Sequence, residues 1–196
     1  MKLSSVNRYF GNIELYLMDQ ILKQRFHVAM KVLDAGCGEG RNLTYFLNAG
    51  FTVYAVDKDP SAVEALRFIA ASLRPDLGRD CVLVADLENL PYPDRSFDLI
   101  LCCQVLHCAG NQDQFFLMFD ELVRCLKPGG VLFISMASSI GIKELETTGG
   151  PNRFLLTRNL VKTLKGRYEL NFLEPMKTVN IEDTGCTSIL VLSAPG

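Results

Sequence analysis

The sequence predicts an α/β fold: one doubly wound sheet of seven strands, mostly parallel, with one antiparallel edge strand and helices on both faces. From Lys31 onward, short β-branched runs alternate with helical periodicity, which is typical of a parallel sheet with crossover helices. The run from Leu99 to Cys103 is uninterruptedly apolar, as expected of a strand covered on both faces. The chain has 196 residues and is 48% apolar, so we expect one domain, 1–196, with a substantial core.

Five parallel strands and their crossover helices are expected between residues 31 and 137. The strands are expected at Val32-Leu33, Thr52 to Asp57, Cys81 to Asp86, Phe97 to Gln104 and Val131 to Ser135. Between the first two, Leu43, Phe46 and Leu47 share one helical face, and Gly50 is placed to end that helix in a left-handed cap. Asp59-Pro60 predicts the next helix start. Asn111 to Gln114 resembles a capping box, ahead of an apolar stripe that includes Met118.

The two ends of the chain have a different character. Residues 1–30 are expected to form a helical cap, with one amphipathic helix from Asn12 to Phe26. Within 138–196 we expect a long irregular loop from Ser138 to Asn152, then a short helix capped by Thr157. Two strands should follow. The first is expected at Tyr168 to Leu173, with a possible continuation at Lys177 to Ile181, and the second at Cys186 to Leu192. The link between them is too short for a parallel crossover, which makes this edge pair antiparallel.

Charge and hydropathy exclude several functions. A formal charge of −2 and a pI near 5.7 offer no cationic field for a phosphate backbone, so a nucleic-acid partner is disfavoured. No apolar run reaches the ~20 residues needed to cross a bilayer, and the start lacks the apolar block of a signal peptide, so we expect no membrane partner and a cytoplasmic location. The seven cysteines are odd in number, and most lie in apolar runs without Cys-x-x-Cys spacing. We interpret them as small core residues and expect no metal site.

The most informative stretch runs from Val32 to Gly40, where a strand, a glycine-rich turn and a helix start follow one another. In an open parallel sheet such a turn lies at the carboxyl edge, where ligands bind. A phosphate-binding P-loop needs Gly-Lys, and this chain has no such dipeptide. The dinucleotide pattern G-x-G-x-x-G fits Gly36 and Gly38 but meets Arg41 in its third position. The remaining pattern, G-x-G-x-G, serves a ligand without a pyrophosphate.

Asp34 to Gly40 resembles the first motif of class I S-adenosylmethionine-dependent methyltransferases, which have a Rossmann-like fold. Leu90 to Asp98 is similar to the family's segment before the fourth strand, and Leu126 to Gly130 to its turn before the fifth. The resemblance runs from about residue 31 to 135 and implies that 31–137 is a core that binds S-adenosylmethionine and releases S-adenosylhomocysteine. The cofactor-binding residues that it implies are Asp34, Ala35, Gly36, Cys37, Gly38, Asn42, Asp57, Lys58, Asp86, Leu87, Cys103 and Gln104.

Two aspartates after Gly36 have roles in this resemblance. The family places an acid like Asp57 on the ribose hydroxyls, and one carboxylate can accept hydrogen bonds from both of them. Asp86-Leu87 corresponds to the place where the family contacts adenine through an acidic side chain and a backbone N–H. Asp34 either orients the glycine turn or helps to hold the cofactor's ammonium group, and the sequence leaves both roles open.

The methyl acceptor is less clearly indicated. His107 follows the fourth strand and is either a general base or substrate contact, or a local hydrogen-bonding residue. Tyr9 is either an aromatic lid over the site or an ordinary hydrophobic anchor. Cys103 to Leu106 replaces the Asp/Asn-Pro-Pro-aromatic motif by which methyltransferases of exocyclic or amide nitrogens resemble one another, so those acceptors are disfavoured.

The expected function is methyl transfer from S-adenosylmethionine to a small-molecule acceptor by in-line displacement. We expect a lid formed by the N-terminal helix and the loop from Ser138 to Asn152, with a homodimer as an open alternative to a monomer. The second hypothesis is a non-catalytic cofactor-binding or protein-partner module of the same fold. A third, a nicotinamide-dependent enzyme, conflicts with Arg41.

Overall fold

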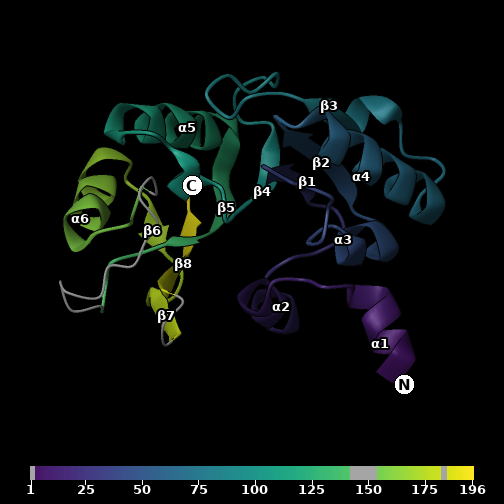
Figure 1. Cartoon of the computed structure of the whole chain (residues 1–196), viewed down its shortest axis with the longest axis horizontal. Coiled ribbons are helices and arrows are strands. Elements are labelled where there is room, and N and C mark those ends of the chain that lie inside the picture. Colours follow the sequence, from purple (N-terminus) through teal and green to yellow (C-terminus); the bar gives the residue numbers. More distant parts are fainter. Residues whose placement is uncertain (1–2, 142–153, 182–184) are drawn as a thin grey trace.

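The computed structural model describes residues 3–141, 154–181 and 185–196. The strands of these residues are β1 Lys31–Ala35, β2 Thr52–Asp57, β3 Val82–Val84, β4 Phe97–Cys103, β5 Leu126–Ala137, β6 Asn171–Phe172, β7 Lys177–Ile181 and β8 Gly185–Ser193. They form one sheet in the order β3-β2-β1-β4-β5-β8-β6, with β7 also paired to β8. The predicted class, a mostly parallel α/β sheet with an antiparallel edge, is confirmed (Figure 1).

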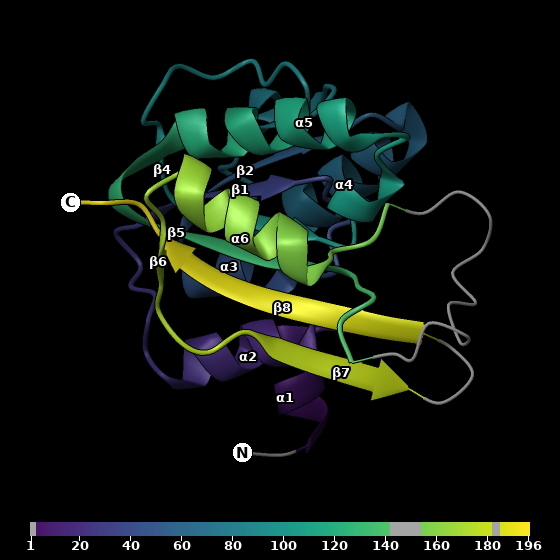
Figure 2. The ribbon, with the colours of Figure 1, turned by 90° about the vertical axis from the view of Figure 1, so that its left-hand side faces the viewer.

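Helices cover both faces of this sheet. They are α1 Leu3–Phe10, α2 Leu15–Leu22, α3 Thr44–Ala49, α4 Pro60–Leu73, α5 Gln112–Cys125 and α6 Arg158–Arg167, with short 3-10 turns η1 Arg79–Cys81 and η2 Leu106–Cys108. One apolar cluster joins the sheet to α5 and α6 and includes Phe119 and Leu160. The other joins the opposite face to α2, α3 and α4 through Leu17, Phe46 and Leu66. Figure 2 shows α5 and α6 together on one side of the sheet, with α1 and α2 on the other.

The sheet reverses its winding direction next to β1. The chain passes from β1 to β2 and β3 on one side, then crosses over to β4 and β5 on the other, with all four pairings parallel. In doubly wound sheets the crevice at such a reversal, outside the carboxyl ends of the strands, is the usual ligand site. The glycine turn after β1 therefore lies where the fold places a ligand.

The antiparallel side differs from the prediction in its strand count. The described residues give eight strands where seven were expected, because the run from Tyr168 onward forms two separate strands. Tyr168 caps the end of α6, so β6 keeps only Asn171–Phe172, and β7 begins at Lys177. Both pair antiparallel with β8, which itself runs antiparallel to β5. The antiparallel part thus extends beyond one edge strand (Figure 2).

Predicted helix ends agree with the structure where a cap specifies them. Asp59 is the N-cap of α4 and accepts from the Ser61 N–H, with Pro60 at the first helical position. Asn111 and Thr157 cap α5 and α6 in the same way. Gly50 ends α3 with φ of +86°.

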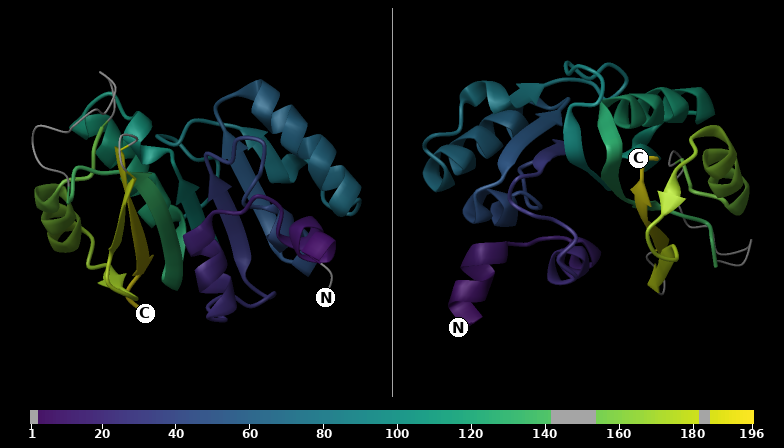
Figure 3. Two further views of the ribbon diagram at one scale, coloured as in Figure 1. Left: turned by 60° about the horizontal axis from the view of Figure 1, so that its bottom comes forward. Right: turned by 180° about the vertical axis from the view of Figure 1, so that it is seen from behind.

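The predicted N-terminal helix from Asn12 to Phe26 is wrong in its bounds. The structure has α1 and then α2, which ends at Leu22. Gly11 separates the two helices with φ of +64°, and the Glu14 side chain starts α2 by accepting from the Leu17 N–H at 2.8 Å. Both helices lie on the same side of the sheet as α3 (Figure 3).

Several strands begin or end at residues other than those predicted. β3 stops at Val84 instead of Asp86, and β4 stops at Cys103 because Gln104 has φ of +62°. β5 is longer than predicted, since residues 126–137 all belong to it. Most of the expected loop from Ser138 to Asn152 lies outside the described residues. None of the helices described has the length and apolar character required to span a bilayer.

Candidate functional site

The turn after β1 brings bare main chain to the carboxyl edge of the sheet. Gly36 and Gly38 have φ of +80° and +51°, a region that other L-residues enter at a cost. A Cβ on Gly36 would lie 2.3 Å from a methyl of Val105, so packing also requires glycine there. A Cβ on Gly38 would have nothing within 4 Å. Gly38 thus faces open space, into which its main chain can meet a ligand.

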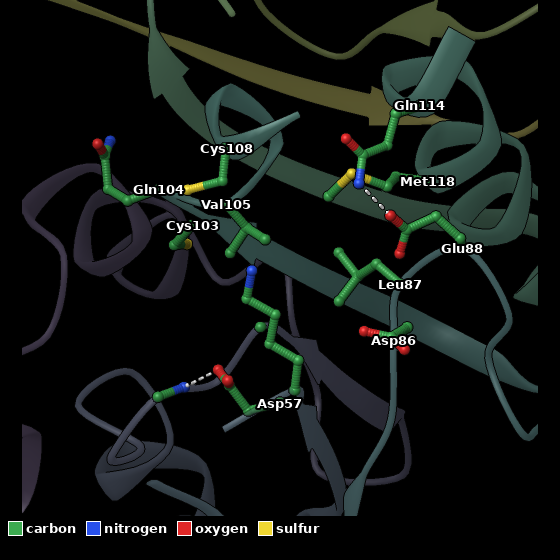
Figure 4. A pocket seen from close by; sticks show the side chains of 13 residues that line it. Asp57, Asp86, Leu87, Glu88, Cys103, Gln104, Val105, Cys108, Gln114 and Met118 are labelled. Atoms are coloured by element: carbon green, nitrogen blue, oxygen red, sulfur yellow. Dashed lines mark hydrogen bonds between the residues drawn. The ribbon is translucent and has the colours of Figure 1, made fainter. Parts of the chain in front are cut away.

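Asp57 is fixed at the end of β2 by two main-chain donors. Its Oδ2 accepts from the Gly38 N–H at 2.8 Å, and its Oδ1 accepts from the Asp59 N–H at 3.0 Å. Figure 4 shows the first of these bonds, with the carboxylate at the rim of the pocket. Each carboxylate oxygen can accept a further hydrogen bond. Asp57 therefore presents a preoriented acceptor next to the glycine turn.

Asp34 lies at the end of β1, beneath the same turn. It is 1% exposed, and its buried Oδ2 has no hydrogen-bond partner among the residues that the structure describes. Burial raises the pKa of Asp34 to about 7, the charge on Asp57 acts in the same direction, and Arg41 opposes both. A buried acceptor without a partner is rare in folded proteins and is a feature of ligand sites. Asp34 is thus suited to a ligand that brings a cationic donor.

A cavity of about 360 Å³ opens between these groups and the neighbouring strand ends. It is lined by Gly36, Gly38, Asp57, Lys58, Asp86, Leu87, Glu88, Cys103, Gln104, Val105, Cys108, Gln114 and Met118. Eight of the twelve predicted cofactor-binding residues are in this set. The lining comes from the ends of β1, β2, β3 and β4 and from the start of α5 (Figure 4). Its size is at the lower end of the range of small-ligand pockets, ~300–1,000 Å³.

Four predicted cofactor-binding residues lie outside the lining. Asp34, Ala35 and Cys37 are buried in the glycine turn or just below it. Asn42 is also buried, and its Oδ1 accepts from the Glu14 N–H at 3.0 Å. Asn42 therefore joins the glycine turn to the start of α2.

His107 and Tyr9 are likewise outside the cavity lining. His107 is 7% exposed in η2, and its Nδ1 accepts from the Ala137 N–H at 3.5 Å. Its main-chain oxygen accepts from the Phe154 N–H at 3.0 Å. Tyr9 packs edge-on against Tyr45 with ring centroids 5.7 Å apart, where α1 meets α3. His107 thus makes hydrogen bonds to β5 and to Phe154, and Tyr9 packs against α3.

The cavity has five lining residues that the sequence prediction missed. They are Glu88, Val105, Cys108, Gln114 and Met118. Glu88 could have been inferred, because it follows Asp86-Leu87 at the same strand end. Gln114 and Met118 are four residues apart and so share one face of α5. The sequence predicts Gln114 as part of a capping box and Met118 as part of an apolar stripe, because it does not show how α5 is oriented over the sheet.

The end of β4 supplies a thiol and a strained residue. Burial raises the pKa of the Cys103 thiol well above its ordinary value, with Asp34 adding to the effect, so Cys103 is a neutral lining group. Gln104 is held in its left-handed conformation by Ser135, whose main-chain oxygen accepts from the Gln104 N–H at 2.7 Å. The Gln104 Nε2 also donates to the Ser135 Oγ at 3.3 Å. Non-glycine residues in this conformation occur preferentially at functional sites.

Known proteins resemble this chain in sequence. The family model described as "Methyltransferase domain" matches residues 33–134. A malonyl-[acyl-carrier protein] O-methyltransferase of Enterobacter lignolyticus is 31% identical over 158 residues, 76% of this chain and 57% of that protein. A ubiquinone biosynthesis O-methyltransferase of Rickettsia typhi is 30% identical over 106 residues, 54% of this chain and 40% of that protein. The chain spans about half the length of the curated relatives it matches.

Solved structures also share the fold. A 1,6-didemethyltoxoflavin-N1-methyltransferase from Burkholderia thailandensis, solved with bound 1,6-didemethyltoxoflavin and S-adenosylhomocysteine, has a TM-score of 0.69 at 19% identity. The match covers 98% of this chain and 86% of that one. The glycine turn and the strand-end aspartates lie at one edge of the sheet, within the residues that the family model matches. The chain belongs to the class I S-adenosylmethionine-dependent methyltransferases.

Proposed function

We propose that this protein transfers a methyl group from S-adenosylmethionine to a small-molecule acceptor. The observation that carries the proposal is the cavity at the sheet reversal, where the open side of Gly38 and the Asp57 carboxylate lie above the buried, unpartnered Oδ2 of Asp34. When bound, the cofactor supplies the activated methyl group, so the protein's task is to bind and align.

The residues fit the three parts of this cofactor. Asp34 offers a buried acceptor for the ammonium group, and the open side of Gly38 leaves room for the amino-acid half. Asp57 offers oriented acceptors for the ribose hydroxyls. Asp86 and Leu87 lie at the other end of the cavity, where we assign the adenine. Lys58 and Cys103 also line the cavity.

The acceptor is proposed to approach at Gln104 and Cys108, which line the cavity at the end of β4 and are exposed. Two curated relatives are named as O-methyltransferases, which favours an oxygen acceptor. A carboxylate or another ionised oxygen needs no base for methylation. We therefore assign His107 the role of holding η2 against β5, supported by its bond to the Ala137 N–H.

The proposed partners are small molecules rather than nucleic acid, and the proposed location is the cytoplasm. The low net charge of −2 supports the first of these. A homodimer is part of the proposal as the form in which a second copy helps to enclose the acceptor. Sedimentation equilibrium at micromolar concentration tests it, and a monomer at every concentration would exclude it.

Calorimetric titration with S-adenosylmethionine, S-adenosylhomocysteine and NAD tests the proposed cofactor. We expect saturable binding of the first two and none of NAD. Transfer of a radiolabelled methyl group into a panel of carboxylic acids, phenols, amines and thiols then tests the reaction. Binding of NAD alone would refute the proposal, and tight cofactor binding without transfer to any acceptor would favour a non-catalytic module.

A further inference from the structure

Two side chains meet at one end of the cavity, beside Asp86 and Leu87 (Figure 4). Glu88 comes from the loop after β3 and Gln114 from the first turn of α5, and both line the cavity. The Gln114 Nε2 donates a hydrogen bond to the Glu88 Oε1. Figure 4 shows the two side chains pointing toward each other, with Asp86 and Leu87 next to Glu88.

The orientation of the Gln114 amide is fixed by a second bond. Its Oε1 accepts from the Gly110 N–H at 2.7 Å. Because an oxygen must face this N–H, the NH₂ end of the amide must face Glu88. The start of α5 is fixed too, since the Gln114 N–H donates to the Asn111 Oδ1 at 2.9 Å. Gln114 thus imposes a hydrogen-bond acceptor on the side chain at position 88.

The other Glu88 oxygen remains available to a ligand. Within the part of the chain that the structure describes, neither the Glu88 Oε2 nor the Asp86 carboxylate has a hydrogen-bond or ion-pair partner. The two carboxylates line the same end of the cavity, with Leu87 between them (Figure 4). The two carboxylates therefore offer free acceptors side by side, and they fit a ligand edge that carries more than one N–H.

We propose that Glu88, held in place by Gln114, is a specificity-determining residue for the base of the cofactor. Together with Asp86 it accepts both hydrogens of the exocyclic 6-amino group of adenine. Asp86 is exposed and Glu88 half-buried, and a 6-oxo purine would direct its carbonyl oxygen at these two carboxylates, where it repels them and leaves their hydrogen bonds unmade. This inference rests on the proposed function, because it requires the adenosine of the cofactor at this end of the cavity.

Calorimetry with S-adenosylhomocysteine and its 6-oxo analogue, S-inosylhomocysteine, tests the inference. We expect the unmodified protein to bind the adenine compound more tightly. In Glu88→Gln, the introduced amide must direct its oxygen to Gln114 and its NH₂ group to the base. The dissociation constant of S-inosylhomocysteine divided by that of S-adenosylhomocysteine should then fall by about tenfold or more.

A double variant tests the role of Gln114. In E88Q/Q114E, the new carboxylate at position 114 accepts from Gly110 and from the amide at position 88. That amide then directs its oxygen to the base, so the preference for adenine should return. Glu64→Gln, which changes an exposed glutamate on α4 that pairs with Arg67 and Arg79, is the matched control and should leave the ratio unchanged.

The outcomes separate this inference from the proposed function. If the unmodified protein binds neither compound, the proposed function is refuted and the inference with it. If it binds S-adenosylhomocysteine and Glu88→Gln keeps the same ratio, the inference is refuted and the proposed function stands. If the preference for adenine is lost in Glu88→Gln and does not return in E88Q/Q114E, the orienting role of Gln114 is refuted. Should Glu88→Gln fail to fold, Gln114→Leu keeps the carboxylate, removes its donor and should lower the ratio.

Discussion

Asp34 is buried where its surroundings oppose its charge. Its side chain is 1% exposed, and the neighbouring Asp57 carboxylate adds repulsion. Such a group destabilises the folded protein when ionised, because the unfolded chain ionises it in water at no comparable cost. A ligand cation would remove that penalty on binding. Stability without ligand is thus reduced at the residue that we assign to the cofactor's ammonium group.

Replacing Asp34 by Asn should stabilise the ligand-free protein in a pH-dependent way. The folded-state pKa of Asp34 is raised from 3.8 to about 7, so the folded protein holds a proton that the unfolded chain releases. The penalty is therefore absent below pH 4, grows between pH 4 and 7, and is complete above pH 7. In thermal unfolding, the melting temperature of Asp34→Asn relative to that of the unmodified protein should rise over that pH range. A difference in melting temperature between Asp34→Asn and the unmodified protein that is the same at pH 5 and at pH 8 would contradict this.

The same substitution should weaken binding of S-adenosylhomocysteine above pH 7, because the ammonium group loses its anionic partner. In the unmodified protein, affinity should rise as the pH passes through about 7, since only the ionised form of Asp34 attracts a cation. Titration calorimetry at pH 6 and pH 8 checks both effects. Unchanged affinity in Asp34→Asn would place the ammonium group elsewhere.

Asp57→Ala should raise the dissociation constant of S-adenosylhomocysteine by about tenfold or more, through loss of charge-assisted hydrogen bonds worth roughly 1.5–3 kcal/mol. Part of the loss comes from the Gly38 N–H, which Asp57 now holds in place. Asp80→Ala, which removes an exposed aspartate of η1 that lies outside the cavity lining, serves as the control. An unchanged constant in a folded Asp57→Ala protein would remove Asp57 from the site.

At the scale of elements, two asparagines attach the N-terminal helices to the core. The buried Asn42 accepts from the Glu14 N–H at the start of α2. Asn48 donates to the main-chain oxygens of Arg8 and Tyr9 at the end of α1. The start of α2 is therefore held by Asn42, which lies between the glycine turn and α3. Asn42 is one of the cofactor-binding residues that the family resemblance implies.

Asn42→Ala should lower the free energy of unfolding by about 1–3 kcal/mol, since it leaves the Glu14 N–H without its partner. Asn48→Ala, at a half-buried position, should cost less. Urea unfolding measures both. A loss of cofactor affinity in Asn42→Ala without loss of stability would instead support the cofactor-binding role.

The opposite end of α2 is held by an ionic cluster around Glu174, in the segment between β6 and β7. Glu174 pairs with Lys23 at 2.8 Å, with Arg25 at 3.3 Å and with Lys177. Gln20 also donates to it, at 3.1 Å. Burial acts to raise the pKa of Glu174, but the hydrogen bonds from Lys177 and Lys23 outweigh it and lower the pKa. The cluster thus joins α2 to the antiparallel strands.

Glu174→Gln should destabilise the protein by about 1–2 kcal/mol at neutral pH. Because the folded-state pKa is lowered, Glu174 contributes stability above its ordinary pKa of 4.5 and loses it as the pH falls further. The variant should therefore lose less stability than the unmodified protein on acidification from pH 6 to pH 3. Parallel pH curves from chemical unfolding would contradict this contribution.

At the scale of the whole molecule, the sequence predicts what local chemistry determines. The glycine turn, the caps at Asp59 and Asn111 and the left-handed end at Gly50 each depend on a few neighbouring residues. The parallel order follows from alternating strand and helix patterns. Strand ends were less predictable, because a turn such as that at Gln104 is imposed by its contact with Ser135 on a neighbouring strand.

The site was predictable from the sequence only in part. Residues that line the cavity from strand ends, such as Asp57 and Asp86, follow from fold topology. Gln114 and Met118 do not, because their place in the lining depends on how α5 rotates over the sheet. The α2 helix is set by distant contacts, including one between Gln20 and Glu174.

A crystal structure of the protein with S-adenosylhomocysteine tests the central proposal most directly. We expect the ribose hydroxyls on the Asp57 carboxylate, the ammonium group near Asp34 and the adenine between Val105 and the loop that carries Asp86. A ligand whose sugar lies away from Asp57, or density for the compound at a different place on the protein, would contradict the proposed site.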